Sequence, residues 1–328
     1  MIKIKTFIDP SHSDWILGGI FREIYKENPK FYKEPKIVSK LRSKHIIASL
    51  IHISGAIIRR SPIIFSSLTP LQNFTKIWPY NSNLRFLWYT HSEIMLTEKT
   101  VKLLNKTKII FVHSIAEKEK LTNYGINSLI VPVIGAIQSE YFKEMSIIGD
   151  RIVWIGTFSP RKNAELALKF VQQNPNIQFR FYVKNWDSSE LVKIANSFDN
   201  IEYYEINSPL KSINFNGCSH HLILSEVEGG PMSLLETLAS GLIPISTKVG
   251  FVEEILSELG YSKQLISDPS NFRDIREKYN KVYTVEHRKK IALKVKEYNY
   301  KRLSDKIASE IYASFSTSQK PFKMSFTK

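Results

Sequence analysis

The amino-acid sequence predicts an α/β protein with two domains. Short apolar runs alternate with helical stretches along most of the 328 residues, as a parallel sheet with helices on both faces requires. The alternation is interrupted once, over residues 135–149, which lack a clear period and are interpreted as a linker. A chain of this length also has room for two domains of ordinary size. We therefore expect an N-terminal domain over residues 1–140, a C-terminal domain over residues 150–300, and a terminal segment over 301–328.

The first domain begins with residues 2–8, where apolar residues alternate with lysines and predict a strand. A polar loop, a glycine pair and a helix to about Glu27 follow. Residues 40–60 predict a second helix with an apolar face, and Pro62 ends it. The remaining apolar runs predict strands over residues 63–65, 85–90, 108–112 and 129–134.

The second domain repeats the alternation. The expected strands cover residues 151–156, 179–183, 201–204, 222–224 and 243–245, and the expected helices cover residues 163–173, 191–198, 231–240 and those after Gly250. Gly241 ends the helix that Pro231 opens. The last part of the chain is also helical, with a long helix over residues 303–315.

Composition and charge narrow the range of functions. The only cysteine is Cys218, which fits a reducing compartment. The N-terminus lacks a signal-peptide pattern, and the longest apolar run, residues 46–58, is too short to span a bilayer. The net charge of +15 is spread along the chain, without a zinc spacing, an aromatic RNA-binding pattern or a basic arm. The sequence therefore predicts a cytoplasmic protein without a nucleic-acid partner, and it favours anionic substrates or a membrane surface.

The most informative stretch is a loop and the helix that follows it. Gly229 and Gly230 let a ligand approach the backbone closely, and Pro231 stands near the first helical turn. The backbone amides around Met232 and Ser233, together with the helix dipole, predict an anion site.

Two carboxylates flank this anion site. Glu228 precedes the glycines, and Glu236 lies on the buried side of the helix, where it needs hydroxyl or amide donors. A ligand with a central phosphate and hydroxyl groups at both ends, such as a nucleotide sugar, fits the arrangement. The alternative is that both residues have a structural role. Glu228 would then be a loop carboxylate near the positive end of the helix, and Glu236 would be solvated or paired with a neighbouring residue.

The complete pattern is more specific than its parts. The sequence E-G-G-P-x-x-x-x-E, followed by L-A-S-G-x-I-P-I, resembles the donor site of retaining glycosyltransferases of the GT-B fold, family 4. The resemblance is strongest over residues 151–267. It implies two Rossmann-like domains facing across a cleft, with a terminal helix crossing back to the first domain. It also implies transfer of a sugar, with retention, from a nucleotide diphosphate sugar to a glycan or lipid-linked acceptor, as in cell-surface polysaccharide synthesis.

The resemblance also implies residue roles. Glu228 would bind hydroxyls of the donor sugar, and Glu236 those of the ribose. Lys162 matches the lysine of the second domain's first β/α unit, and Arg161 is a second candidate cation for the diphosphate. The diphosphate site would be completed by the backbone amides of the glycine loop and the first helical turn. These belong to Gly229, Gly230, Met232 and Ser233, and Pro231 lies between the two pairs.

Further candidates stand at the ends of strands in the first domain. His91 resembles a family histidine near the donor sugar; alternatively it caps the helix expected after it. Ser114 matches a family serine and is equally well explained as a helix N-cap. Gly18 and Gly19 resemble a glycine pair near the donor phosphates or the acceptor, a weak pattern because glycines before helices are common.

Two departures from the family pattern keep an alternative function open. Thr157 stands where many members have arginine, and Phe251 replaces the second glycine before Glu254. A non-catalytic GT-B binding or scaffold subunit therefore remains a candidate. A sugar-nucleotide epimerase of the same fold has less support, because the E-G-G-P loop is typical of transferases.

The sequence predicts neither a metal nor a cofactor. It contains no D-x-D pair, the pattern with which other nucleotide-sugar enzymes hold a divalent ion. If the acceptor is lipid-linked, the basic and apolar residues of segment 40–60 predict peripheral contact with the anionic inner face of the membrane. The alternative is that this segment packs on the sheet of the first domain.

Overall fold

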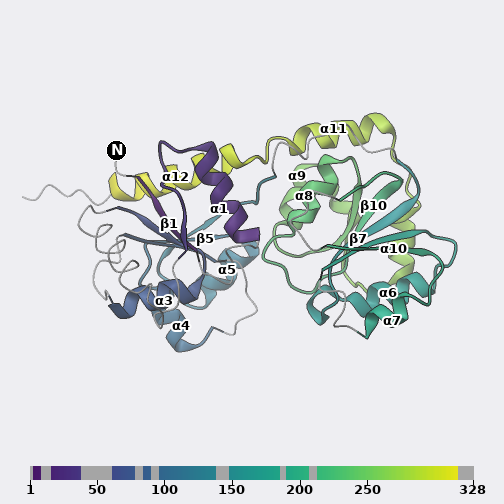
Figure 1. Cartoon of the computed structure of the whole chain (residues 1–328), viewed down its shortest axis with the longest axis horizontal. Helices are drawn as coiled ribbons and strands as arrows, with labels where there is room; N and C mark the ends of the chain where they lie inside the picture. Colours follow the sequence, from purple (N-terminus) through teal and green to yellow (C-terminus); the bar gives the residue numbers. More distant parts are fainter. Residues whose placement is uncertain are drawn as a thin grey trace, which may run out of the picture.

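The structure is a computed structural model that describes residues 3–8, 16–37, 61–77, 84–89, 96–137, 148–184, 190–206 and 213–316. It contains two six-stranded sheets in which all strand pairs are parallel (Figure 1). The order is β2-β1-β3-β4-β5-β6 in the first sheet and β12-β11-β10-β7-β8-β9 in the second. The predicted α/β fold with two Rossmann-like sheets is confirmed.

The first sheet consists of short strands that are buried on both faces. Ile64, Phe86 and Phe111 contribute to a core on one face, while their neighbours Ile63 and Leu87 contribute to the core on the other, as the two-residue period of a strand requires. Its strands and described helices are β1 (Lys5–Ile8), α1 (Ile16–Glu27), β2 (Lys36–Ile37), β3 (Ile63–Phe65), α3 (Leu68–Ile77), β4 (Arg85–Trp88), α4 (Glu98–Leu104), β5 (Ile109–Val112), α5 (Ile115–Asn123) and β6 (Leu129–Pro132).

The second sheet has β7 and β10 side by side at its centre. Strand order reverses between these two, which is where open parallel sheets bind ligands beyond their carboxyl ends. Its elements are β7 (Arg151–Thr157), the 3₁₀ helix η4 (Pro160–Lys162), α6 (Ala164–Gln172), β8 (Phe179–Lys184), α7 (Leu191–Ala195), β9 (Ile201–Glu205), β10 (Cys218–Ile223), α8 (Met232–Ala239), β11 (Ile243–Thr247), α9 (Val252–Glu258), η6 (Ser262–Gln264), β12 (Leu265–Ile266), α10 (Phe272–Tyr279) and α11 (Val285–Val295).

Strand β10 and helix α1 begin earlier than the sequence predicted. Strand β10 begins at Cys218, four residues before the expected start, because its polar side chains find partners inside the fold. His221 Nδ1 lies 2.9 Å from Thr237 Oγ1, and His220 Nδ1 lies 2.8 Å from Ser219 Oγ. Helix α1 begins at Ile16, before the glycine pair that was expected to precede it.

Helix α12 (Tyr300–Ser316) returns to the first sheet after the second is complete, and Figure 1 shows it beside α1. Leu303, Ile307 and Ile311 join the core that contains Ile64 and Phe86. The two segments that connect the sheets also meet, because Ile137 N donates a 2.8 Å hydrogen bond to Tyr298 O.

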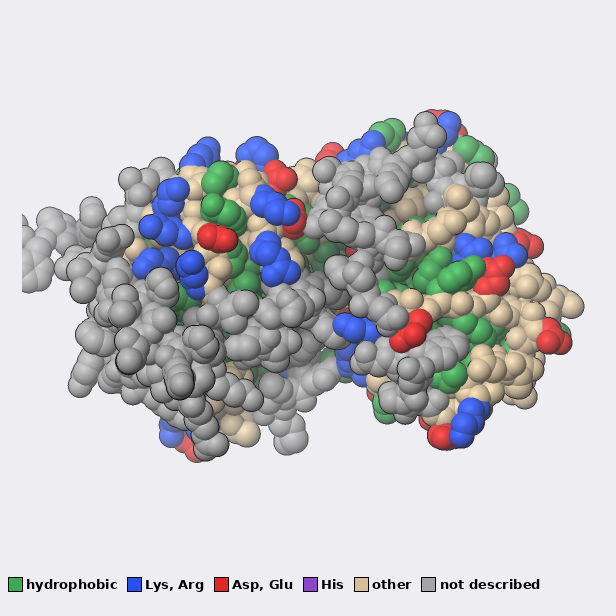
Figure 2. Space-filling model, in the orientation of Figure 1, with side chains coloured by type: hydrophobic (Ala, Val, Ile, Leu, Met, Phe, Trp, Pro, Cys, Tyr) green, Lys and Arg blue, Asp and Glu red, His purple; other side chains and the backbone are tan. Residues whose placement is uncertain are grey.

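Figure 2 shows Lys and Arg side chains gathered over the half of this face that contains α1 and α12, with a few acidic and apolar ones among them. On the other half, basic and acidic side chains are interspersed with apolar ones. Within the described ranges, no helix is both long and apolar enough to cross a membrane. The expected amphipathic helix over residues 40–60 lies outside the described residues.

Candidate functional site

The candidate site lies where β7 and β10 end side by side. After β7 the chain forms η4, which carries Arg161 and Lys162. After β10 it passes Ser225 and reaches Glu228 in the loop before α8. The reversal of strand order therefore brings together two loops that are more than sixty residues apart in sequence.

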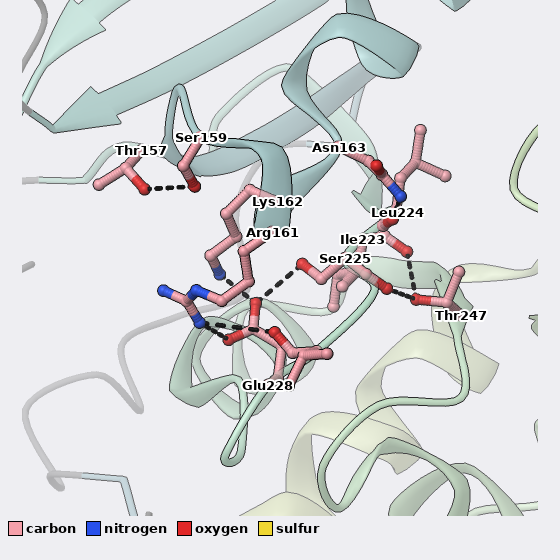
Figure 3. A network of polar contacts seen from close by, with 11 residues as sticks. Thr157, Ser159, Arg161, Lys162, Asn163, Ile223, Leu224, Ser225, Glu228 and Thr247 are labelled. Atoms are coloured by element: carbon pink, nitrogen blue, oxygen red, sulfur yellow. Dashed lines mark hydrogen bonds and ion pairs between the residues drawn. The ribbon is translucent and has the colours of Figure 1, made fainter. Parts of the chain in front are cut away.

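Glu228 is the centre of a polar cluster at this point (Figure 3). Lys162 Nζ donates a hydrogen bond to Glu228 Oε1, and Arg161 Nη1 donates to Oε2 over 3.2 Å. Ser225 Oγ also donates to Oε1, over 2.8 Å. The Glu228 side chain is only 7% exposed, whereas those of Lys162 and Arg161 are 16% and 32% exposed. The three charged residues proposed from the sequence are therefore in direct contact.

Asn163 holds the basic turn in place, a role that the sequence reasoning missed. Its backbone is left-handed, with φ 50° and ψ 42°, a conformation that Asn tolerates better than most residues. Its Nδ2 donates to Leu224 O at the end of β10 over 2.8 Å, and Glu226 N donates to Arg161 O over 3.0 Å. An asparagine directly after the basic pair was the only available signal.

Thr157 does not extend the cationic cluster. Its hydroxyl lies 3.2 Å from Ser159 Oγ, in the short segment between β7 and η4 (Figure 3). The basic groups at this edge are thus Arg161 and Lys162, one turn further along the chain.

The first turn of α8 presents backbone amides rather than a side-chain cap. Pro231 is the N-cap residue, and among the described residues no side chain bonds to this helix end. The amides of Met232 and Ser233 begin the helix, where the dipole favours an anion. At the other end Gly241 has φ +81° and terminates the helix as predicted.

Glu236 is buried within the second turn of α8. It is 7% exposed, and its Oε2 has no hydrogen-bond partner in the described part of the chain. Burial raises the pKa of this carboxyl to about 8, so the group is largely protonated at neutral pH. A buried oxygen of this kind has unused capacity for a hydrogen bond from a ligand.

The glycine loop is shaped by protein packing as well as by any ligand. A Cβ added at Gly230 would lie 2.4 Å from Phe251 Cε1 and 3.3 Å from His113 Cβ. Gly250, with φ +52°, comes so close that its own Cβ would lie 2.8 Å from Gly230 Cα. Packing therefore also constrains Gly230, because Phe251 occupies the space beside it.

The same region joins the two sheets. The rings of His113 and Phe251 meet edge to face at 6.2 Å, and Trp88 Nε1 donates to His113 Nε2 over 3.1 Å. Glu254 Oε1 accepts a 2.7 Å hydrogen bond from Ile115 N, in the first turn of α5. A carboxylate from α9 therefore satisfies the amino end of a helix from the other sheet.

Ser114 and the glycine pair, candidates from the first domain, do not join the cluster. Ser114 is the N-cap of α5, and its hydroxyl accepts a 3.1 Å hydrogen bond from Glu117 N, the structural alternative stated above. Gly18 and Gly19 lie inside α1, and a Cβ at Gly19 would meet no atom of the described residues within 4 Å. His91 lies outside the described residues. Within the described ranges, no group of three His, Cys, Asp or Glu side chains could hold a metal ion.

A comparison with models of protein families finds a match in the second half of the chain. Residues 149–302 match the model of the family described as Glycosyl transferases group 1. This match contains Arg161, Lys162, Glu228 and Glu236. No curated protein matches the chain by sequence.

Solved structures extend the likeness to almost the whole chain. A glycosyltransferase from Rickettsia africae ESF-5 has a TM-score of 0.69 at 14% identity and covers 97% of this chain and 99% of its own. Sucrose-phosphate synthase from Thermosynechococcus elongatus has a TM-score of 0.68 at 10% identity, with 96% and 100% covered. The lipopolysaccharide outer core galactosyltransferase WaaB has a TM-score of 0.65 at 13% identity, with 94% and 99% covered. Residues 149–302 therefore match the group 1 glycosyl transferase family, within a chain that has the GT-B fold.

Proposed function

We propose that this protein is a glycosyltransferase that moves a hexose-type sugar from a nucleoside diphosphate donor to a glycan or lipid-linked acceptor. One observation carries the proposal: Arg161, Lys162 and Glu228 meet beyond the carboxyl ends of β7 and β10, where parallel sheets bind nucleotides. The family match of residues 149–302 supports the same reaction class.

In this proposal the diphosphate binds between the cations and the first turn of α8. Fixed ammonium, guanidinium and amide groups stabilise the charge that develops on the leaving nucleoside diphosphate. Because such groups are already present, the reaction needs no divalent ion. Glu236 would accept hydrogen bonds from the ribose hydroxyls, since it is a buried carboxyl with an oxygen that lacks a partner in the described part of the chain.

Glu228 would bind hydroxyl groups of the transferred sugar, and His91 would contact the sugar from the first domain. Retention of the anomeric configuration, and the assignment to family 4, follow from the resemblance of the E-G-G-P loop. A glycan acceptor and a place in cell-surface polysaccharide synthesis are supported by the fold shared with a lipopolysaccharide outer core galactosyltransferase. A cytoplasmic location with residues 40–60 against the membrane remains part of the proposal.

A non-catalytic GT-B binding subunit is the second candidate. Phe251 favours it, because the ring fills the space beside Gly230 and contacts His113 across the two sheets. Thr157 bonds to Ser159 and supplies no charge to the cluster. Such a subunit would bind a nucleotide sugar without consuming it.

The test is a screen of nucleotide sugars with the purified protein, in which mass spectrometry follows loss of the donor with and without glycan or lipid-linked acceptors. The proposal expects release of nucleoside diphosphate from one donor, undiminished in excess chelator. Binding without release would favour the non-catalytic subunit. An activity lost in chelator and restored by magnesium would refute the metal-independent mechanism. The anomeric proton of the product, observed by NMR, tests retention.

A further inference from the structure

We infer that Glu228 makes this site select diphosphates that carry a sugar over bare diphosphates. This inference rests on the proposed function. It starts from the observation that the side chain expected to bind sugar hydroxyls is bonded to the two cations expected to bind the diphosphate. In the unliganded protein, Glu228 is thus the counter-ion of Arg161 and Lys162.

A bare diphosphate that reaches these cations meets the Glu228 carboxylate at hydrogen-bond distance from the same N–H groups. If the cations are shared, the two anions repel each other. If the phosphate takes the cations, the Ser225 hydroxyl is the donor that Glu228 keeps within the described residues. Because the Glu228 side chain is 7% exposed, water replaces the lost bonds poorly. Either way, binding of the bare diphosphate is weakened.

A sugar on the diphosphate removes this cost. Its hydroxyl groups donate hydrogen bonds to the carboxylate, so that Glu228 exchanges two cations for neutral donors while the phosphates take the cations. The exchange leaves Glu228 hydrogen-bonded to the sugar and both cations paired with phosphate. After transfer the sugar hydroxyls are gone, and the nucleoside diphosphate faces the repulsion again. Glu228 therefore also favours release of the product.

The surrounding loops do not depend on the Glu228 side chain for their shape. Asn163 anchors η4 to Leu224 O, and Thr247 Oγ1 donates to Ser225 O over 2.6 Å. Replacement of Glu228 by Gln preserves size and leaves an amide oxygen for the Ser225 hydroxyl. The variant Glu228→Gln is therefore expected to fold and to differ from the wild type mainly in charge.

Calorimetry with inorganic pyrophosphate as the probe tests the inference. Glu228→Gln should bind pyrophosphate about tenfold more tightly than the wild type, the scale of one hydrogen bond to a charged group. The matched control is Glu226→Gln, which removes an equal charge from an exposed position of the same loop and should match the wild type. Equal or weaker binding by Glu228→Gln, or no binding by any variant, would overturn the inference.

A second measurement addresses the sugar. For the nucleotide sugar that the wild type binds, the ratio of its affinity to that of the corresponding nucleoside diphosphate should fall in Glu228→Gln. An unchanged ratio, or no bound nucleotide sugar, would overturn the selectivity. The pyrophosphate result needs no turnover, so the two proposals can fail separately. Transfer by the wild type with unchanged pyrophosphate affinity in Glu228→Gln would refute only this inference.

Discussion

At the scale of single residues, the carboxyl of Glu236 differs strongly in pKa from an ordinary glutamate. The Glu236 carboxyl is buried, and its Oε2 has no hydrogen-bond partner in the described part of the chain. Burial raises its pKa to about 8, so the group keeps its proton at neutral pH. A protonated carboxyl can both donate and accept a hydrogen bond, which suits the two hydroxyls of a ribose.

The raised pKa of Glu236 predicts a specific dependence of stability on pH. Between the ordinary carboxyl pKa of 4.5 and the folded value of about 8, the folded protein holds a proton that the unfolded chain has lost. The contribution of Glu236 to stability is therefore fully present below pH 4.5 and is lost as the pH rises toward 8, by up to about 1.4 kcal/mol per pH unit. Glu236→Gln should remove this loss.

The check is thermal unfolding of the wild type and Glu236→Gln from pH 5 to pH 9. The difference in Tm, variant minus wild type, should increase up to about pH 8 and then level off. Burial lowers the pKa of His220 and His221 to about 3, so both histidines weaken the fold as the pH falls below 6.5. That effect is common to both proteins and cancels in the difference. A difference that stays constant with pH would show that Glu236 titrates normally.

At the scale of elements, the contact between Gly230 and Phe251 links the loop before α8 to the start of α9. The variant Gly230→Ala places a methyl group 2.4 Å from the Phe251 ring, and the ring is fully buried. We expect a loss of about 1–3 kcal/mol in the free energy of unfolding, as overpacking usually costs.

The double variant Gly230→Ala with Phe251→Ala tests the cause. If the ring is the obstacle, the cost of Gly230→Ala should be much smaller in the Phe251→Ala background, which denaturant unfolding of the four proteins would reveal. Equal costs in both backgrounds would mean that the backbone of Gly230, and not the Phe251 ring, sets the requirement for glycine.

The sequence predicted elements well where a local pattern defines them. The four residues expected to form the core-facing side of α8 are buried, although most of the other residues of this helix are buried as well: Leu234, Leu235, Leu238 and Ala239. The start of β10 was wrong because His220 and His221 are polar in the sequence but have partners inside the fold. The position of Gly18 and Gly19 within α1 was missed because glycine usually interrupts a helix.

For the candidate cluster, the sequence named individual residues but did not predict how they meet. The donor-loop motif pointed to Glu228, and the first β/α unit of the second domain pointed separately to Lys162. Their contact depends on β7 and β10 being neighbours in the sheet, a long-range property that no local pattern encodes. The same holds for Asn163, because its hydrogen bond to Leu224 also requires β7 and β10 to be neighbours in the sheet.

At the scale of the whole molecule, α12 and two contacts near α9 tie the two halves together. Tyr32 Oη donates to Ser304 O over 2.7 Å, and Asn28 Nδ2 donates to Ser304 Oγ over 2.7 Å. These bonds fix α12 on the first sheet. On the other side of the linker, Glu254 bonds to α5 and Phe251 contacts His113.

The contact between Glu254 and the Ile115 amide predicts that the backbone amides at the start of α5 are protected from hydrogen exchange. In Glu254→Ala the amides at the start of α5 should exchange hydrogen about tenfold faster or more, since a hydrogen bond to a charged group is lost. Glu253→Ala is the control, because Glu253 is half-exposed and bonds to Lys248. Hydrogen exchange followed by mass spectrometry of peptides covering residues 113–120 makes the comparison. Unchanged exchange in Glu254→Ala would mean that the two sheets do not depend on this contact.

The central claim is that the loops after β7 and β10 bind the diphosphate of a nucleotide, and Lys162 tests it most directly. Calorimetry would compare the wild type, Lys162→Ala and Lys193→Ala with ADP, CDP, GDP, TDP and UDP; Lys193 is an exposed lysine of α7. The account predicts that the wild type binds one of the five and that Lys162→Ala binds it at least about tenfold more weakly, with Lys193→Ala unchanged. Equal affinity in all three proteins, or no binding by the wild type, would contradict it.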